Sequence, residues 1–279
     1  MAEKIEQTIG VIGAGSMGAA IARGLVASGA AAPGRVLVAN PSAGRLAPLA
    51  ELGIMTFTSN DELLAQGPDA VVLAVKPQVL PGVLGEHAEG LAGLLAISIA
   101  AGVSVASLEA ALPGSRVVRA MPNLPVQVHS GATAVCPGSR ATREDLALAL
   151  AIFSALGSAV VLREDQLDAE GAVVGCGPAY MALLVDDLTR AGVERGLPAA
   201  ACRRLVLSTM RGTAEQLLAS REHPRADREK VTSPGGTTAA GLRAMESGMF
   251  DVACAGVDAA LRRTRELSET AGGMEATDD

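Results

Sequence analysis

Short apolar runs alternate with amphipathic stretches through the first 163 residues of the chain. Apolar runs bounded by Gly, Pro or Ser are typical of buried strands, and the stretches between them have helical periodicity. This alternation predicts an α/β fold with a Rossmann-type, doubly wound, mostly parallel sheet. The predicted strands are 9–12, 35–39, 54–58, 70–75, 94–99, 116–120, 130–135 and 159–162, with a helix before the last one that starts near Thr142.

The pattern changes after Arg163, where strand-like alternation ends. Several of the helical segments that follow are apolar nearly all round, as in 179–185, and such a helix is usually buried. In a unit this small we expect a second copy of the chain to cover it. We therefore predict two domains, 1–163 and an all-α dimerisation domain over 164–279, with a polar, disordered tail at 271–279. The predicted helices are 166–174, 178–195, 198–220, 237–247 and 250 to about 270.

A glycine-rich turn follows the first predicted strand. Gly13, Gly15 and Gly18 have the spacing G-x-G-x-x-G and stand between that strand and a helix that ends near Ser28. Gly13 permits the tight turn, Gly15 lets the backbone approach a pyrophosphate, and Gly18 lets the helix pack against the strand. The helix N-terminus supplies free N–H groups and a positive dipole end. The pattern predicts dinucleotide binding; the alternative is a glycine-rich turn without function.

The second predicted strand ends where the ribose of a bound dinucleotide lies. An NAD-specific site places a carboxylate there, but this chain has Asn40, followed by Ser42 and Arg45. Ser42 and Arg45 are suited to a 2′-phosphate, so we expect NADP, with NADPH preferred over NADH. The alternative is that Ser42 only caps the next helix and Arg45 is solvated.

Three further candidates stand at the carboxyl ends of predicted strands, where doubly wound sheets bind their ligands. Lys76, Ala101 and Asn123 each directly follow such a strand or its short extension. Because parallel strands end at one edge of a sheet, we expect these residues along the same edge as the glycine-rich turn.

Composition excludes several classes of function. The net charge is −7 with no basic block, so we expect no nucleic-acid partner. The four cysteines form no C-x-x-C pair and the three histidines are scattered, so we expect no metal site. The acidic and basic N-terminal residues run directly into a strand without a signal peptide, and the longest apolar run, 91–103, is too short to span a bilayer. We therefore expect a cytoplasmic protein without a membrane partner.

A second loop of small residues, 231–238, precedes a predicted helix. It reads Val-Thr-Ser-Pro-Gly-Gly-Thr-Thr and places hydroxyls and backbone N–H groups at a helix N-terminus. Such a loop can hold an anion, including a carboxylate, without an arginine. The alternative is a capping loop without a ligand, in which Thr237 is the N-cap residue.

These stretches together resemble the pyrroline-5-carboxylate reductase family over essentially the whole chain. The resemblance lies in 11–18, 73–78, 97–102, 117–123, 131–134, 177–180 and 231–238 with its extension 240–242, and the Ser-Pro-Gly-Gly-Thr-Thr run is the most specific. The resemblance implies NADPH-dependent hydride transfer to the C=N carbon of 1-pyrroline-5-carboxylate, giving L-proline, the last step of proline biosynthesis. It also implies a homodimer with interleaved C-terminal helices, often built into a larger ring, with a decameric ring as one form.

The resemblance assigns residues to the site. Thr238 is implied as the catalytic residue whose hydroxyl meets the ring nitrogen, and Asn60 is implied to reach the adenosine phosphate region. Residues implied to bind the substrate are Ser233, Gly235, Gly236, Thr237 and Thr238. Those implied to bind the cofactor are Gly13, Ala14, Gly15, Ser16, Met17, Gly18, Asn40, Ser42, Arg45, Asn60, Ala74, Val75, Lys76, Pro77, Ala100, Ala101 and Asn123.

The chain departs from the family pattern at Leu124, Val174 and Cys176, near the expected substrate. A paralogue that reduces a related cyclic imine therefore stays open, as does a non-catalytic NADP-binding regulator. The intact 231–238 loop speaks against the regulator. A hydroxyacid dehydrogenase would use a helical lysine, and no lysine occurs between Lys76 and Lys230. Cys176 stands near a helix start, but we interpret it as a packing residue rather than a nucleophile.

Overall fold

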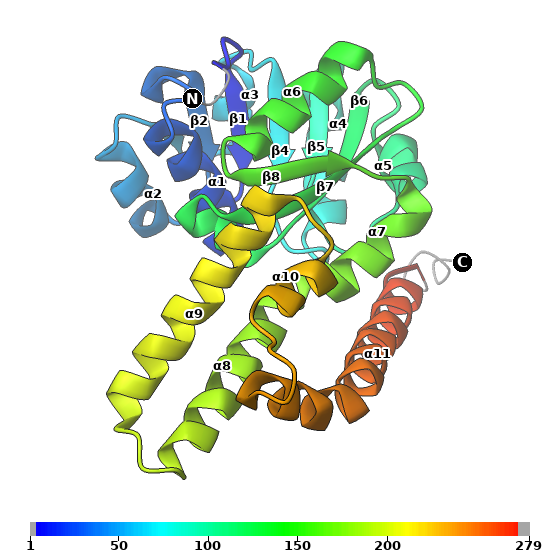
Figure 1. The fold of residues 1–279 in the computed structure, drawn as a ribbon. Coiled ribbons are helices and arrows are strands. Elements are labelled where there is room, and N and C mark those ends of the chain that lie inside the picture. The colour runs from blue at the N-terminus through cyan, green and yellow to red at the C-terminus, as the bar shows by residue number, and fades with distance from the viewer. Residues whose placement is uncertain (1–3, 273–279) are drawn as a thin grey trace. The chain divides into compact units, whose positions relative to one another are not determined.

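The computed structural model describes residues 4–272, with side chains described through Glu266. The chain divides into two compact units (Figure 1). The first contains the residues up to Cys176 and those from Ala260 onward, and the second is Gly177–Ala259. The predicted domain boundary at 163/164 stays a prediction. The tail expected to be disordered lies outside the described residues, except that the last helix continues through Gly272.

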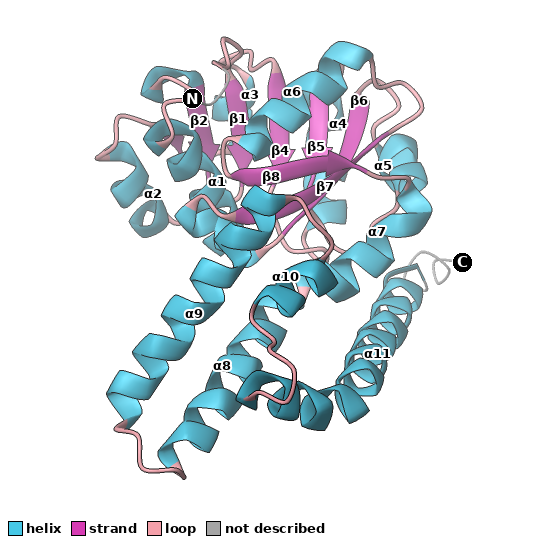
Figure 2. Ribbon diagram, in the orientation of Figure 1, coloured by secondary structure: helices cyan, strands magenta, loops and turns pink. Residues whose placement is uncertain are grey.

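The described residues of the first unit form an eight-stranded sheet in the order β3-β2-β1-β4-β5-β6-β7-β8. All neighbouring strands pair in parallel except β6 and β7, which are antiparallel. The predicted doubly wound, mostly parallel sheet is confirmed (Figure 2). The strands are β1 (Ile9–Ile12), β2 (Val36–Ala39), β3 (Met55–Phe57), β4 (Ala70–Leu73), β5 (Leu95–Ser98), β6 (Arg116–Pro122), β7 (Gly131–Pro137) and β8 (Gly157–Val161).

Strand boundaries differ from the prediction by at most two residues, most clearly at β6. Strand β6 continues past Ala120 because β7 pairs along it, with Pro122 opposite Thr133. A 3-10 turn, Leu124–Val128, connects the two strands. A connection this short suits antiparallel neighbours, since a parallel crossover needs about a dozen residues or more.

Helices cover both faces of the sheet and bury separate apolar clusters. Val72 of β4 belongs to the cluster on one face, together with Ile21 of α1 and Phe153 of α6. Its neighbour Val71 belongs to the cluster on the other face, with Leu84 of α4. Adjacent strand residues point to opposite faces, so a continuous apolar strand fills both clusters. These helices are α1 (Ser16–Ala27), α2 (Ala43–Ala50), α3 (Asn60–Leu64), α4 (Leu80–Leu91), α5 (Val105–Ala111) and α6 (Arg143–Ser154).

The two edges of the sheet differ. Strand β3 has only three residues, whereas β8 has five. The side chains of Val160 and Val161 on β8 are 51% and 46% exposed. The β8 edge is therefore the longer and the more apolar of the two.

Only helices follow β8 in the described residues, as predicted, but their boundaries need three corrections. The predicted helix 166–174 is α7 followed by a π-helical turn. A short helix, α10, lies where none was predicted. The predicted helices 237–247 and 250–270 are one continuous helix, α11, because a single glycine such as Gly248 costs only about 1 kcal/mol in a helix. The elements are α7 (Glu164–Glu170), the π-helix (Gly171–Gly175), α8 (Gly177–Val193), α9 (Ala199–Ser220), α10 (Pro224–Lys230) and α11 (Thr237–Gly272).

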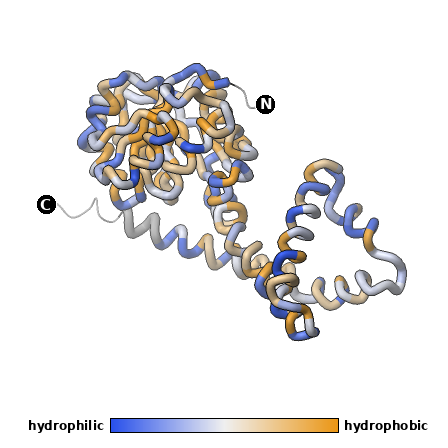
Figure 3. The backbone as a smooth tube through the Cα atoms, turned by 90° about the vertical axis from the view of Figure 1, so that its left-hand side faces the viewer, coloured by the Kyte–Doolittle hydropathy of each residue, from blue (hydrophilic) through white to orange (hydrophobic). Residues whose placement is uncertain are grey.

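Helices α8, α9 and α11 expose apolar side chains within the single chain. Figure 3 shows apolar positions interspersed with polar ones along the helical segments. Helix α8, predicted to be buried, leaves Met181 and Leu183 more than half exposed. A single copy of the chain therefore does not bury these faces. The exposed large apolar residues of α8, α9 and α11 are Met181, Leu183, Leu188, Val193, Leu205, Leu207, Leu218, Met245, Met249, Phe250 and Val252.

Candidate active site

The glycine-rich turn between β1 and α1 is tightly packed at two of its three glycines. Gly13 has φ +103°, and a Cβ there would lie 2.7 Å from the carbonyl oxygen of Ala74. A Cβ on Gly18 would run into the carbonyl oxygen of Gly13. Neither position accepts a side chain, as the fingerprint predicts for the turn and for helix packing.

Gly15 is the exception within this turn, because a Cβ there would meet no heavy atom within 4 Å. Gly15 is also the N-cap residue of α1, whose N-terminus has no side-chain cap and no acidic residue in its first turn. Open space in front of uncapped N–H groups at a helix N-terminus fits an anionic pyrophosphate. The turn therefore fits the cofactor that its sequence predicts.

Asn40 has a structural role that the sequence interpretation missed. Its side chain is buried, and its Oδ1 accepts a hydrogen bond from the Ala14 N–H at 3.1 Å. Its Nδ2 donates to the Ser42 carbonyl oxygen at 3.4 Å. Asn40 thus ties the glycine-rich turn to the end of β2. An acidic residue in this place would accept from Ala14 but could not donate to Ser42.

Ser42 and Arg45 lie at the start of α2, where the sequence predicts a 2′-phosphate contact. Ser42 is the N-cap residue, but its hydroxyl makes no capping hydrogen bond. The side chains of Ser42 and Arg45 are both exposed. Ser42 therefore occupies the N-cap position, but its hydroxyl does not cap the helix.

The ends of β4, β5 and β6 carry the residues predicted for the nicotinamide side. The Ala74 N–H donates to the Ile12 carbonyl oxygen. Ala100 is buried, and its N–H donates to the Ser98 hydroxyl. Lys76 and Ala101 are exposed. Strands β1, β4, β5 and β6 are parallel, so these ends share one edge of the sheet. The structure therefore brings the predicted cofactor residues of the first unit to the same edge.

Asn123 is also at this edge and is held from two sides. Its buried side chain accepts from the Ala132 N–H at 2.8 Å and donates to the Val174 carbonyl oxygen at 3.2 Å. Val174 belongs to the π-helix, a rare turn that is frequent at functional sites. Asn123 therefore fastens the π-helix to the end of β6.

Glu170 ends α7 immediately before the π-helix. Burial raises the pKa of its carboxyl from 4.5 to about 7. Its Oε2 is buried and has no hydrogen-bond partner among the described residues. The adjacent Gly171 approaches β6, since a Cβ on Gly171 would lie 3.5 Å from Cε of Met121. A carboxyl group that keeps its proton near neutral pH thus lies close to the edge of the sheet that carries the predicted cofactor residues.

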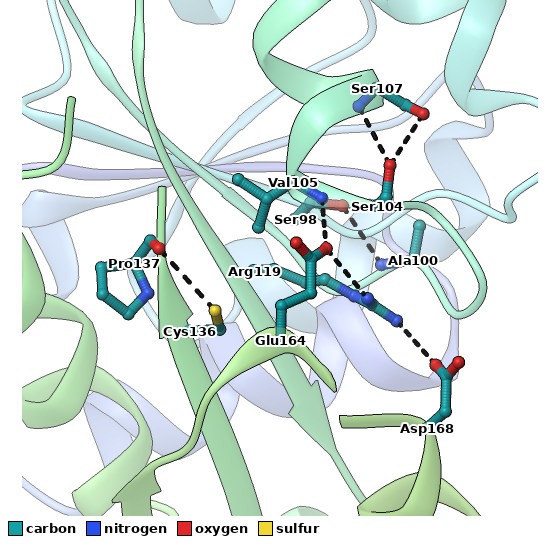
Figure 4. Close-up of polar contacts among 10 residues, drawn as sticks. All are labelled: Ser98, Ala100, Ser104, Val105, Ser107, Arg119, Cys136, Pro137, Glu164 and Asp168. Carbon is teal, nitrogen blue, oxygen red and sulfur yellow. Dashed lines mark hydrogen bonds and ion pairs between the residues drawn. The ribbon is translucent and has the colours of Figure 1, made fainter. Parts of the chain in front are cut away.

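Arg119 is a second residue that the sequence interpretation missed. It is 4% exposed on β6 and forms ion pairs with Glu164 at 3.3 Å and Asp168 at 3.4 Å (Figure 4). Glu164 also accepts the Val105 N–H at the start of α5. The buried guanidinium of Arg119 and the carboxylate of Glu164 together connect β6, α7 and the start of α5. A charged residue within an apolar strand was the available signal, because buried charges are normally paired.

The 231–238 loop lies in the second unit and opens α11. The Gly236 N–H donates to the Ser233 carbonyl oxygen at 3.0 Å, and the Thr232 hydroxyl donates to Arg228 at 2.6 Å. Gly235 has φ +73°, and a Cβ on Gly236 would overlap the Ser233 hydroxyl. These contacts form a closed turn whose exposed residues include Ser233, Gly235, Thr237 and Thr238. The residues predicted to bind the substrate therefore lie in one turn at the start of α11.

No group of three or more His, Cys, Asp or Glu side chains suited to a metal ion occurs among the side chains described, residues 4–266. Cys176, the residue after the π-helix, is exposed and is not part of a disulfide.

A glycine-rich turn at the edge of a doubly wound sheet is typical of a dinucleotide-binding protein. Residues 8–102 match the family model described as NADP oxidoreductase coenzyme F420-dependent, and residues 164–267 match pyrroline-5-carboxylate reductase dimerisation. The chain is 40% identical to the pyrroline-5-carboxylate reductase of Synechocystis over 94% of this chain and 98% of that one. The chain belongs to the pyrroline-5-carboxylate reductase family and is an oxidoreductase of the CH–NH class.

Solved structures agree with this assignment. A pyrroline-5-carboxylate reductase from Coxiella burnetii has a TM-score of 0.90 at 34% identity, covering 94% of this chain and 99% of its own. A Plasmodium falciparum pyrroline carboxylate reductase with NADP bound has a TM-score of 0.83 at 29% identity, covering 95% and 99%. Both comparisons support the fold, and the second supports NADP as the cofactor.

The dimerisation match also bears on the apolar helices. By length and composition alone, Glu164–Val193 could cross a membrane, and few residues of its most apolar window are buried. The same residues lie within the part that matches the dimerisation family model. The exposed apolar faces of α8, α9 and α11 therefore fall within the part of the chain that matches this dimerisation family model.

Proposed function

We propose that this protein reduces 1-pyrroline-5-carboxylate to L-proline with NADPH, the last step of proline biosynthesis. One observation carries the proposal: the chain has both the glycine-rich turn Gly13–Gly18 and the 231–238 loop, and 94% of the chain aligns with a reductase of this family. NADPH supplies the hydride when it is bound. The remaining work of the protein is to bind, to orient and to provide a proton.

The cofactor residues divide by the part of NADPH that each would hold. Gly13–Gly18 with the α1 N-terminus suits the pyrophosphate, and Ser42 with Arg45 suits the 2′-phosphate. Asn60 suits the adenosine part. The residues suited to the nicotinamide side are Ala74, Val75, Lys76, Pro77, Ala100, Ala101 and Asn123.

The substrate residues act on the two polar ends of the cyclic imine. The turn from Ser233 to Thr237 offers hydroxyls and N–H groups to the carboxylate at the N-terminus of α11. The Thr238 hydroxyl hydrogen-bonds the ring nitrogen. As the C=N carbon gains hydride, the C=N electron pair moves to nitrogen, and Thr238 helps to deliver the proton that completes the N–H bond.

Preference for NADPH over NADH forms part of the proposal. It rests on the absence of a carboxylate at Asn40 and on the exposed Ser42 and Arg45. The expected result is a higher kcat/KM with NADPH in the unmodified protein and a reduced ratio in Arg45→Ala. A preference for NADH that Arg45→Ala leaves unchanged would remove this part of the proposal.

The proposed assembly is a homodimer, with a decameric ring as its larger form, in the cytoplasm. The exposed apolar helices and the dimerisation match support the dimer. Light scattering on dilute protein tests it, and a stable, active monomer would contradict it.

Steady-state turnover of 1-pyrroline-5-carboxylate with NADPH tests the function itself. Leu124, Val174 and Cys176 differ from the family pattern, so the assay includes a second cyclic imine of different ring size. Faster turnover of that imine would identify a paralogue with another substrate. Binding of NADPH without turnover of either imine would identify a regulator.

A further inference from the structure

A buried histidine lies behind one of the proposed cofactor residues. His87 is on α4, is 9% exposed, and has hydrogen-bond partners at both ring nitrogens. Its Nδ1 is 2.9 Å from Oδ1 of Asp61, and its Nε2 is 3.1 Å from Nδ2 of Asn60. Asn60 and Asp61 begin helix α3, which lies beside α4.

The two contacts determine which ring nitrogen carries the proton. An ionised carboxylate only accepts hydrogen bonds, so Nδ1 of His87 must donate to Asp61. In the neutral ring Nε2 then has a lone pair, which accepts from the Asn60 amide nitrogen. The Asn60 amide is thereby fixed, with its Oδ1 directed away from the imidazole.

Asn60 stands at the edge of the sheet that holds the proposed cofactor residues. It follows β3, and the β3 residue Phe57 accepts the N–H of Asn40, which in turn binds the glycine-rich turn. Its side chain is partly exposed, whereas His87 is buried. A ligand at this edge can therefore reach Asn60 but not His87.

We propose that His87 is a positioning residue for NADP(H): it holds the Asn60 amide with its oxygen presented to a hydroxyl of the adenosine ribose. This inference rests on the proposed function. Asp61 determines which ring nitrogen of His87 carries the proton, and His87 in turn orients the Asn60 amide. The three side chains therefore form a chain of hydrogen bonds that ends at the edge of the sheet with the proposed cofactor residues.

Calorimetric titration of the full chain with NADP⁺ tests the inference. We expect His87→Leu and Asn60→Ala each to raise the Kd about fivefold to tenfold, the usual effect of one hydrogen bond. The double variant should lose no more than Asn60→Ala alone, because the two side chains act in sequence. His87→Gln, which keeps an acceptor, should bind within about twofold of the unmodified protein at pH 8.

Rescue by His87→Gln separates positioning from simple packing. If the imidazole only filled space beside α3, His87→Gln and His87→Leu should weaken NADP⁺ binding equally, whereas a positioning role requires an acceptor opposite the Asn60 amide nitrogen.

The outcomes distinguish this inference from the proposed function. If the unmodified protein binds no NADP⁺, the proposed function fails and the inference fails with it. Unchanged affinity in His87→Leu, or losses in His87→Leu and Asn60→Ala that add, would overturn the inference alone. Should His87→Leu not fold, a loss of affinity in His87→Gln equal to that in Asn60→Ala would overturn it equally.

Discussion

Two glycine-containing turns each lead into a helix, and they differ in how they are held. In the turn at Gly13–Gly18, a side chain at Gly13 would collide with the carbonyl oxygen of Ala74, directly after β4, and a side chain at Gly18 with that of Gly13. The turn at 231–236 is closed by hydrogen bonds within itself and with α10, and most of its residues are exposed. The first turn belongs to a packed core, whereas the second is a surface feature of its unit.

This difference separates two kinds of mutational effect. A change at Gly13 or Gly18 should damage folding before it damages chemistry, since neither position has free volume for a side chain. A change in the exposed turn should leave the fold intact and alter substrate binding or turnover. Substitutions in the two turns therefore test whether each is what its surroundings indicate.

The largest effect is expected for Gly18→Ala. The added methyl would overlap the Gly13 carbonyl oxygen and lie 2.9 Å from the Ala74 Cβ, and backbone cannot move aside as a flexible side chain can. We expect a loss of about 3 kcal/mol or more in unfolding free energy, and a Tm lower by roughly 10 °C. Thermal unfolding followed by circular dichroism measures it.

Two glycines provide matched controls for this experiment. Gly44 on α2 has open space around its Cβ position, so Gly44→Ala should leave the Tm unchanged or raise it slightly. Gly15→Ala should also keep the Tm but weaken NADPH binding by about tenfold or more, equivalent to about 1.4 kcal/mol. An unaltered Tm in Gly18→Ala would show that the turn is not locked.

Thr238→Ala tests the exposed turn. Loss of one hydrogen bond to the substrate nitrogen is worth roughly 1–3 kcal/mol, so kcat/KM should fall about tenfold to a hundredfold. The Kd for NADPH and the Tm should remain unchanged. Thr238→Ser should retain much of the activity, and Ser233→Ala should mainly raise KM. Normal turnover by a folded Thr238→Ala protein would remove Thr238 from the mechanism.

Glu170→Gln tests how the buried carboxyl at the end of α7 affects stability. The pKa of Glu170 rises from 4.5 to about 7 on folding, so the native state binds more protons than the unfolded state between these values. Its contribution to stability therefore falls as the pH rises from 4.5 to 7 and stays low above that. Because the carboxyl is half-buried, we expect a cost of about 1 kcal/mol at pH 8.

The measurement is the Tm of both proteins across this pH range. Glu170→Gln should be more stable than the unmodified protein at pH 8 by roughly 2–4 °C, and the two should converge toward pH 4.5. Glu89→Gln, a change at an exposed carboxyl on α4, is the control and should show no such convergence. Parallel pH profiles for Glu170→Gln and the unmodified protein would contradict the raised pKa.

The smallest effect is expected for Glu246→Gln. Arg228 of α10 and Glu246 of α11 form an ion pair at 2.7 Å, one on each side of the 231–236 turn. Both side chains are about half exposed, so the pair is worth at most about 1 kcal/mol and is screened by salt. The KM for the imine should rise by no more than about fivefold, and less at high salt.

The exposed ion pair between Arg211 and Glu215 on α9 is a matched control for that experiment, since it has the same 2.7 Å distance. Glu215→Gln should leave the KM for the imine unchanged. Equal effects of Glu215→Gln and Glu246→Gln would indicate a general charge effect rather than support of the turn.

The sequence predicted most of the fold because its signals are local. Apolar strands, the glycine spacing and the helix start near Thr142 each depend on a few neighbouring residues. The helical region was predicted less well. Helix α10 is short and polar, and the break expected before Phe250 ignored how little one glycine costs a long helix.

Within the site, the sequence indicated which residues to consider but not what holds them. The contact between Asp61 and His87 joins positions 26 apart, and that between Asn123 and Val174 joins positions 51 apart. Neither follows from periodicity, because each depends on how elements pack. Asn40 was interpreted only through the carboxylate it lacks, and its contact with Ala14 emerges only in three dimensions.

The β8 edge of the sheet has a practical consequence for colloidal behaviour. A strand at an edge presents unpaired N–H and C=O groups that can pair with another chain, and apolar side chains there favour such pairing. The short β3 limits this tendency at its own edge, whereas Val160 and Val161 promote it at β8. We therefore expect β8 to promote aggregation of heated or partly unfolded protein.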